Sequence, residues 1–321
     1  MNPQPWVVGH LTGSGSPCET PVLVIGFNRP NLLADVIERL RSVRPNRLFL
    51  AIDGPRPQIP DELEKVRACR ALVDRIDWPC DVATLFREEN LGCGRAVSSA
   101  VTWFFDHVES GIILEDDILP EPSFFGFCSE LLERYRHDPR IFAVSGCNFV
   151  PPEFQSRSSD PYRFSQVPHI WGWATWRDRW QLYSLDIAGW QRRLPPLTLW
   201  KRAGHSLSGA AYWASTFELL ARRKVDTWDG QLVFASMVSG GLTATSNVNL
   251  IENRGFGADA THTHEDRGDL QPVGIAHLPL AAVPTLLDAR ADKWTRVHHF
   301  RAHWRGILRQ AQTYFTSYGR Q

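Results

Sequence analysis

Pro21-Val-Leu-Val-Ile-Gly-Phe27 is the first sustained apolar run of the chain, and the polar residues Asn28-Arg29-Pro30 follow it directly. An unbroken apolar run of this kind is typical of a strand buried on both faces. The same pattern of apolar run, polar turn and helically spaced apolar residues then recurs, with runs over 47–52, 81–86 and 111–114. Four alternating β/α units predict an α/β domain with a mostly parallel sheet flanked by helices.

The composition is that of an ordinary globular protein. Of the 321 residues, 43% are apolar and 22% are charged, which excludes a disordered or fibrous chain. The 35 basic side chains equal the 35 acidic ones, so no overall positive field exists to attract nucleic acid, and we expect no nucleic-acid partner. No uninterrupted apolar run is long enough to predict a transmembrane helix.

The cysteines and the two ends of the chain bear on its location. The six cysteines form no C-x-x-C pair and no zinc-like spacing with histidine, and residues 1–20 read as a flexible lead-in without the apolar core of a signal peptide. We therefore expect free thiols and a cytoplasmic protein. The segment 292–309 mixes cations with aromatic residues, which leaves two interpretations open: a terminal helix docked on the domain, or a peripheral contact with the inner face of a membrane.

Polar residues collect where the predicted strands end. They are Asn28 and Arg29, Asp53, the segment 87–95, and Glu115-Asp116-Asp117. Because open α/β sheets bind ligands beyond the carboxyl ends of their strands, this edge of the sheet is the candidate site.

The sharpest motif is Glu115-Asp116-Asp117, directly after the apolar run 111–114. Three adjacent carboxylates repel one another unless a cation compensates them. Hard oxygen ligands of this type suit Mg²⁺ or Mn²⁺, held by one or two carboxylates together with substrate phosphates. The alternative is a solvated acidic turn at a strand end.

At this motif the sequence resembles a known family. Gly111-Ile-Ile-Leu-Glu-Asp-Asp-Ile-Leu-Pro-Glu-Pro-Ser-Phe-Phe125, followed by Asp138-Pro-Arg-Ile-Phe-Ala-Val-Ser-Gly-Cys-Asn148, is similar to the metal-binding stretch of nucleotide-sugar glycosyltransferases with the Rossmann-like GT-A fold. The pattern is similar to that of bacterial sugar transferases related to N-acetylglucosaminyltransferase I. The resemblance implies a GT-A domain over 21–265 and leaves 266–321 as a C-terminal extension, for which helix is one option.

The resemblance also implies roles for the residues at the strand ends. Asp117 would bind the metal, while Glu115 and Asp116 would lie near the ribose and the donor sugar. The nucleotide would be held by Asn28, Arg29, Asp53 and Arg95, the last from the glycine-rich segment 90–95. A carboxylate at Asp53 can accept the imide N–H of uracil, which favours a UDP-sugar; the alternative for Asp53 is a turn residue before Gly54.

Three later segments match the family pattern as well. Asp229, in Thr227-Trp-Asp-Gly230, occupies the position of the catalytic base that deprotonates the acceptor hydroxyl in an inverting transfer. Its alternative role is that of an N-cap for the helix that follows. Trp171 and Trp173 would face the donor sugar and the acceptor, with a packed aromatic cluster as the alternative. His262 would contact the metal or the diphosphate, and His264 is a neighbouring candidate for the same role. The alternative is that the histidine is exposed to solvent and has no function.

The sequence thus predicts a metal-dependent, inverting glycosyltransferase that moves a sugar from a nucleotide diphosphate to a glycan or a lipid-linked glycan in polysaccharide synthesis. Two alternatives stay open. A sugar nucleotidyltransferase usually carries a glycine-rich basic loop after the first strand, which residues 26–30 lack. A carbohydrate-binding protein without catalytic activity would not need both the acidic motif and Asp229.

Overall fold

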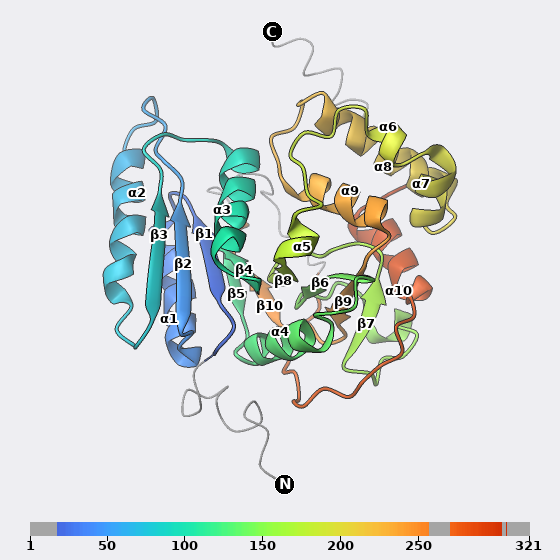
Figure 1. Cartoon of the computed structure of the whole chain (residues 1–321), viewed down its shortest axis with the longest axis horizontal. Coiled ribbons are helices and arrows are strands. Elements are labelled where there is room, and N and C mark those ends of the chain that lie inside the picture. Colours follow the sequence, from blue (N-terminus) through green and yellow to red (C-terminus); the bar gives the residue numbers. More distant parts are fainter. Residues whose placement is uncertain (1–17, 257–269, 304–305, 307–321) are drawn as a thin grey trace.

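The computed structural model describes residues 18–256, 270–303 and 306. Its centre is an eight-stranded sheet with helices on both faces (Figure 1). In spatial order the strands are β3 (Asp81–Phe86), β2 (Arg47–Ile52), β1 (Val22–Gly26), β4 (Ser110–Glu115), β8 (Trp173–Trp176), β6 (Ile141–Ser145), β9 (Leu242–Ser246) and β7 (Tyr162–Ser165). Only β8 and β7 run antiparallel to their neighbours. The prediction of an α/β, Rossmann-like fold with a mostly parallel sheet is confirmed.

The strand β1 shows why the sheet carries helices on both sides. Val22 and Val24 pack into the core under α1, whereas Leu23 and Ile25 pack under α3. A strand that is buried on both faces has to be apolar at every position, which is the pattern that the sequence shows. The helices on the first face are α1 (Pro30–Val43), α2 (Glu62–Ala71) with its continuation η2 (Leu72–Arg75), and α4 (Ser123–Arg134); those on the second are α3 (Cys93–His107), α5 (Arg177–Trp180) and α9 (Asp229–Ser239).

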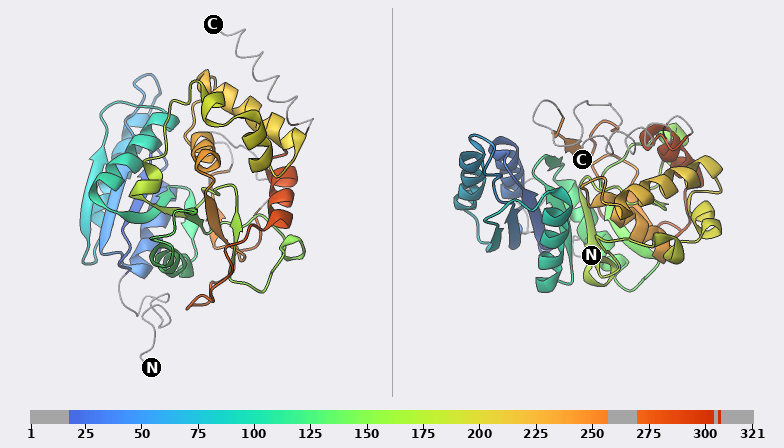
Figure 2. Two further views of the ribbon diagram at one scale, coloured as in Figure 1. Left: turned by 45° about the vertical axis from the view of Figure 1, so that its right-hand side comes forward. Right: turned by 90° about the horizontal axis from the view of Figure 1, so that it is seen from above.

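A third apolar cluster forms the core of a helical lobe beside the sheet. Its helices are α6 (Trp190–Arg193), α7 (Pro196–Arg202) and α8 (Leu207–Ala221). They gather at the opposite end of the molecule from α1 and α2, as the views of Figure 2 also show. The short elements η3 (Pro152–Phe154), α10 (Ala289–Trp294) and η4 (Thr295–His299) complete the described helices.

A two-stranded antiparallel sheet brings distant parts of the chain together. In it β5 (Ile118–Pro120), which directly follows the acidic motif, pairs with β10 (Ile251–Asn253). This pairing places the end of the described chain before residue 257 beside Asp117, where the amide of Arg254 donates to the Asp117 carbonyl at 2.9 Å.

The segment 150–200 contains elements that the sequence analysis does not predict. It contains β7 and β8 in the main sheet, and α5, α6 and α7. The strand β8 was missed because its four residues, Trp173–Trp176, suggested an aromatic loop, whereas all four are buried between β4 and β6.

The segments assigned to the two ends of the chain contact the domain wherever they are described. Cys18 donates its amide to the carbonyl of Val43 at 3.1 Å. Near the other end, the Asp288 amide donates to Phe164 of β7 at 2.9 Å, and Asp288 accepts from Ser156. None of the helices in the described ranges has both the length and the apolar character that a membrane crossing requires.

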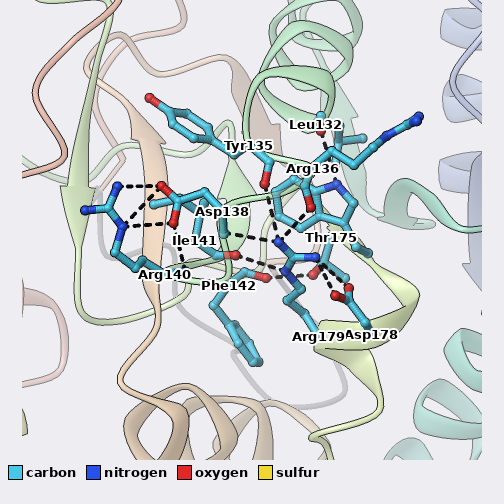
Figure 3. A network of polar contacts seen from close by, with 11 residues as sticks. Leu132, Tyr135, Arg136, Asp138, Arg140, Ile141, Phe142, Thr175, Asp178 and Arg179 are labelled. Atoms are coloured by element: carbon cyan, nitrogen blue, oxygen red, sulfur yellow. Dashed lines mark hydrogen bonds and ion pairs between the residues drawn. The ribbon is translucent and has the colours of Figure 1, made fainter.

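The buried Arg179 of α5 fastens β8 to the turn between α4 and β6 (Figure 3). Its guanidinium donates to the carbonyls of Arg136 at 3.0 Å and Asp138 at 3.1 Å and pairs with the carboxylate of Asp178. It also lies 4.6 Å from the ring centroid of Trp176. The carbonyls of this turn, which lies beyond the end of α4, thus receive their hydrogen bonds from a buried side chain of α5.

Candidate functional site

A cavity of about 460 Å³ opens at the carboxyl ends of β1, β2 and β4. Six carboxyl groups and two guanidinium groups line it, which makes it strongly acidic. The lining residues predicted from the sequence are Arg29, Asp53, Glu115, Asp116, Asp117, Trp171 and Asp229. The structure therefore brings together residues from five separate segments at the predicted edge of the sheet.

Arg29 is the direct counterion of the acidic motif. It stands at the N-cap of α1, where Pro30 fixes the first turn. Its guanidinium donates to both carboxylate oxygens of Asp116, and its Nη1 lies 3.0 Å from Oδ2 of Asp117. One arginine thus occupies two of the three adjacent carboxylates.

The remaining negative charge of the motif is poorly compensated. Burial, together with the charges of Asp117 and Asp116, raises the pKa of Glu115. Burial also raises the pKa of Asp116, although Arg29 opposes that change. Burial thus disfavours the charged form of both Glu115 and Asp116, and a cation bound beside them would favour it.

A divalent cation fits this donor set if a substrate completes its coordination. Asp117 keeps 17% of its side chain exposed, and its Oδ2 lies so close to Gly255 that a Cβ at that position would collide with it. Within the described residues, no group of three or more His, Cys, Asp or Glu side chains is arranged to hold a metal ion. A cation held by these carboxylates would need further ligands from a substrate, such as the phosphate oxygens that commonly complete the coordination of Mg²⁺.

Asp229 faces the acidic motif from the start of α9. It is the first residue of that helix rather than its N-cap, which is Trp228, so the alternative N-cap role is wrong. Its Oδ1 accepts from the Gly230 amide at 2.8 Å and from the hydroxyl of Thr227. Among the described residues, Oδ2 receives no hydrogen bond, so one oxygen is held in place and the other is available to a ligand.

Asp53 is already engaged by the protein. Its carboxylate accepts from the side-chain amide of Asn90 at 3.0 Å and from the backbone amide of Leu91. Burial raises its pKa despite these bonds. Asp53 thus joins the end of β2 to the segment before α3, in addition to facing the cavity.

The glycine-rich segment before α3 accommodates a carboxylate of the protein. Asp226 accepts from the amide of Gly94 at 3.0 Å, and a Cβ on Gly92 or Gly94 would collide with its oxygens. Arg95 is exposed and does not line the cavity. The expectation that Arg95 faces a phosphate here is therefore corrected: the helix terminus is already occupied by Asp226.

Asn28 also points away from the cavity, toward a polar pair that sequence reasoning missed. Its side-chain amide donates to Oε1 of the buried Glu62 at 3.0 Å, and Glu62 in turn pairs with Arg56. Arg56 lines the cavity and lies 5.4 Å from the ring centroid of Phe27. The only sequence signal for Arg56 was its place in the turn after β2.

The two tryptophans have different positions. Trp171 lines the cavity, with its ring centroid 6.0 Å from that of Phe256. Trp173 is 1% exposed, and its ring stacks on Trp228 within the core. The expectation that Trp173 contacts a sugar is corrected, because its side chain is packed in the core between the sheet and α9.

Other candidate residues are either inert or outside the described residues. Burial and the surrounding carboxylates raise the pKa of the cavity-lining Cys93 to about 12, so its thiol stays protonated and is a poor nucleophile. His262 and His264 lie outside the described residues, between 256 and 270.

Comparisons with known proteins add little at this point. No family model and no curated protein sequence matches the chain. Its structure is similar to the crystal structure of HddC from Yersinia pseudotuberculosis, with 10% identity over 50% of this chain and 77% of that chain and a TM-score of 0.32. It is also similar to UDP-glucose pyrophosphorylase complexed with UDP-glucose, with 10% identity over 51% of this chain and 78% of that chain and a TM-score of 0.31. Likenesses this distant do not assign an activity, which has to be argued from the cavity.

Proposed function

We propose that the protein is a nucleotide-sugar glycosyltransferase that depends on Mn²⁺ or Mg²⁺. The observation that carries the proposal is the acidic cavity itself, where six carboxyl groups meet only two arginines at the ends of parallel strands. A diphosphate would be repelled from such a site unless it arrived with a divalent cation. An acidic motif that faces a separate carboxylate, Asp229, fits sugar transfer.

Asp117 is the proposed ligand of the cation. When bound, a divalent cation stabilises the negative charge that develops on a diphosphate leaving group. Arg29 is placed to do the same for a phosphate oxygen, because its guanidinium presents several donors in a fixed plane. Glu115 and Asp116, in the same motif, would lie near the ribose and the donor sugar.

Asp229 is the proposed general base. Its fixed Oδ1 orients the carboxylate, and Oδ2 would accept the proton of the acceptor hydroxyl as the new glycosidic bond forms. The acceptor oxygen would then attack the anomeric carbon from the face opposite the leaving diphosphate, which inverts the configuration at that carbon. Asp226, which lines the same cavity, is already bonded to Gly94 and is the weaker candidate for this role.

The nucleobase end of the cavity lies between Phe27, Arg56, Asp53 and Asn90. Asp53 accepts two kinds of N–H donor from the protein, so a uracil imide would have to share its oxygens with Asn90 and Leu91. A UDP-sugar remains the favoured donor, with the face of the base lying against Phe27 or Arg56. Trp171 offers a ring to the donor sugar or to a glycan or glycolipid acceptor.

The proposal is tested by nucleotide binding followed by transfer. Thermal unfolding is measured with UDP, GDP, dTDP and CMP, each with and without Mn²⁺, for the wild type, Asp117→Asn and Asp229→Asn. At a hundredfold excess over Kd, a bound nucleotide adds about 2.7 kcal/mol of stability. We expect a Mn²⁺-dependent shift with UDP that Asp117→Asn loses and Asp229→Asn keeps.

Transfer then separates the activity from its alternatives. With the matching nucleotide sugar, the wild type should release the nucleoside diphosphate in the presence of acceptor glycans, and Asp229→Asn should lose most of that turnover. Arg95→Gln is the matched control, because Arg95 is exposed outside the cavity. Pyrophosphate release from a nucleoside triphosphate and a sugar phosphate would instead identify a nucleotidyltransferase, and binding without any turnover would indicate a carbohydrate-binding protein.

A further inference from the structure

The charge of this protein is distributed very unevenly. The whole chain has no net formal charge, yet residues 186–224 contain seven Lys and Arg residues and only two acidic residues, Asp186 and Glu218, which pair with Arg223 and Arg222. This stretch is the helical lobe of α6, α7 and α8, here called the basic lobe. It therefore carries an excess of five positive charges, which the rest of the molecule balances with five negative ones. When charges of one sign are concentrated on one part of a neutral protein, that part attracts partners of the opposite charge.

The basic lobe also exposes large apolar side chains. Leu197, in the first turn of α7, is 64% exposed, and Leu207, at the start of α8, is 75% exposed. Lys201 follows Leu197 by one helical turn, so the two side chains share a face of α7. The lobe has its own apolar cluster, around Trp213 and Phe217, that does not take up either leucine.

The C-terminal segment adds to the same surface. Phe300 packs against Trp213 with ring centroids 5.2 Å apart, and the hydroxyl of Ser208 donates to the carbonyl of Ala302 at 3.3 Å. Arg296 lies over the turn between α7 and α8, where its guanidinium would collide with a Cβ on Gly204. The described start of the tail is thus docked on the domain, and it brings a further cation, Arg296, to the α7–α8 turn.

We propose that the basic lobe docks the protein on the surface of an anionic lipid bilayer. Lys and Arg are attracted by the surface charge of anionic lipids, and exposed leucines can insert into the boundary between headgroups and acyl chains. The two leucines favour a bilayer over a soluble polyanion, because a polyanion offers them no apolar phase. The inference goes beyond the proposed function, since it concerns binding to a surface and not sugar transfer.

The test is flotation of the full-length chain with vesicles of phosphatidylcholine alone and of equimolar phosphatidylcholine and phosphatidylglycerol. We expect binding only to the second kind and release at high salt, because salt screens exposed charges. Replacing both leucines in Leu197→Ser/Leu207→Ser should lower the partition coefficient by roughly tenfold or more. Arg192→Gln/Lys201→Gln should lower it by a similar factor.

The matched control carries the same substitutions at the opposite end of the molecule. Leu63→Ser/Lys65→Gln changes an exposed leucine and an exposed lysine of α2, which lies far from α7 (Figure 1), and it should bind as the wild type does. The inference is overturned if the wild type ignores anionic vesicles, or if the control loses as much binding as the lobe variants. It is also overturned if dextran sulfate binds to the lobe equally well with and without the two leucines while vesicles do not bind.

Discussion

At the scale of single residues, the candidate site depends on how one arginine is shared. Arg29 contacts both Asp116 and Asp117, so the proposed metal ligand is held by a cation of the protein itself. A divalent cation that arrives without a nucleotide has to compete with that guanidinium. A diphosphate offers Arg29 another partner, which couples the binding of the nucleotide to that of the metal.

Arg29→Gln tests this competition. The variant removes a positive charge about 3 Å from the proposed ligand, so we expect Mn²⁺ alone to bind roughly tenfold more tightly than it binds to the wild type. Binding is measured by the loss of the free Mn²⁺ signal in electron paramagnetic resonance. Arg56→Gln, which removes a cation paired with Glu62 elsewhere in the cavity, should have a much smaller effect. Equal or weaker Mn²⁺ binding by Arg29→Gln would contradict the competition.

A second prediction concerns the buried Arg179. Arg179→Met keeps much of the volume but leaves the carbonyls of Arg136 and Asp138 without their donor. We expect the free energy of unfolding to fall by about 3 kcal/mol, measured by urea denaturation. Arg140→Met removes an exposed guanidinium paired with Asp138 and should have a much smaller effect, because solvent screens exposed ion pairs. Similar losses in both variants would contradict the idea that the buried hydrogen bonds of Arg179 stabilise the fold more than an exposed ion pair does.

Because the carboxyl group of Asp292 is buried, we expect the stability of the fold to depend on pH. Burial raises its pKa to about 6, above the value of an unfolded chain, so the unfolded state loses its proton first as the pH rises. Stability then falls between about pH 4 and pH 6. Asp292→Asn should remove this decline, as measured by Tm across that range. Asp138→Asn should leave this range almost unchanged, because Arg140 lowers the pKa of Asp138 and the wild-type pair loses stability only as the pH falls below about 4.

At the scale of elements, the half of the sheet from β1 to β4 was predictable from sequence, whereas β7 and β8 were not. The first strands are continuous apolar runs that end in polar turns. A helix follows each of β1, β2 and β3 in the chain, which is the alternation that the sequence predicts. The strand β8 is built of tryptophans, alanine and threonine, which the period of the sequence does not distinguish from a packed loop. Its place depends on pairing with β4 and β6, which are distant in sequence.

Within the candidate site, the sequence located the residues that directly follow strands, and missed those defined by long-range contacts. Asp117 and Asp229 line the cavity as expected. Arg56 and Asp226 were missed because their places depend on partners such as Glu62 and Gly94, which no local pattern identifies. Trp173 was misplaced because the face of a strand is set by its register.

The packing of α3 on β4 gives a prediction at this scale. A Cβ on Gly111 would collide with the ring of Phe104 in α3 and approach the carbonyl oxygen of Pro21 to 2.8 Å. Gly111→Ala should therefore lower the free energy of unfolding by about 1–3 kcal/mol. The double variant Gly111→Ala/Phe104→Leu should lose less than the sum of the two single variants, since the smaller side chain relieves the collision. Additive losses in a double-mutant cycle would refute this explanation.

At the scale of the whole molecule, the separation of charge has a direct chromatographic consequence. With a pI near 7.2, a uniformly charged protein would pass through both types of ion exchanger at neutral pH. We expect this protein to be retained by a cation exchanger through the basic lobe and by an anion exchanger through its acidic remainder. Arg192→Gln/Lys201→Gln should elute earlier from the cation exchanger only. Passage of the wild type through both columns would show that the charge of the basic lobe and that of the rest of the molecule cancel at the column surface.

The pairing of β5 with β10 has a consequence for how the protein is made. A chain emerging from the ribosome can form β1 to β4 once residue 115 has emerged, yet the wall of the cavity beside Asp117 comes from residues that follow β10. The acidic motif is therefore synthesised long before the segment that encloses it. During translation these carboxylates stay open to water, so the growing chain has no formed cavity and the proposed activity can begin only when nearly the whole chain has emerged.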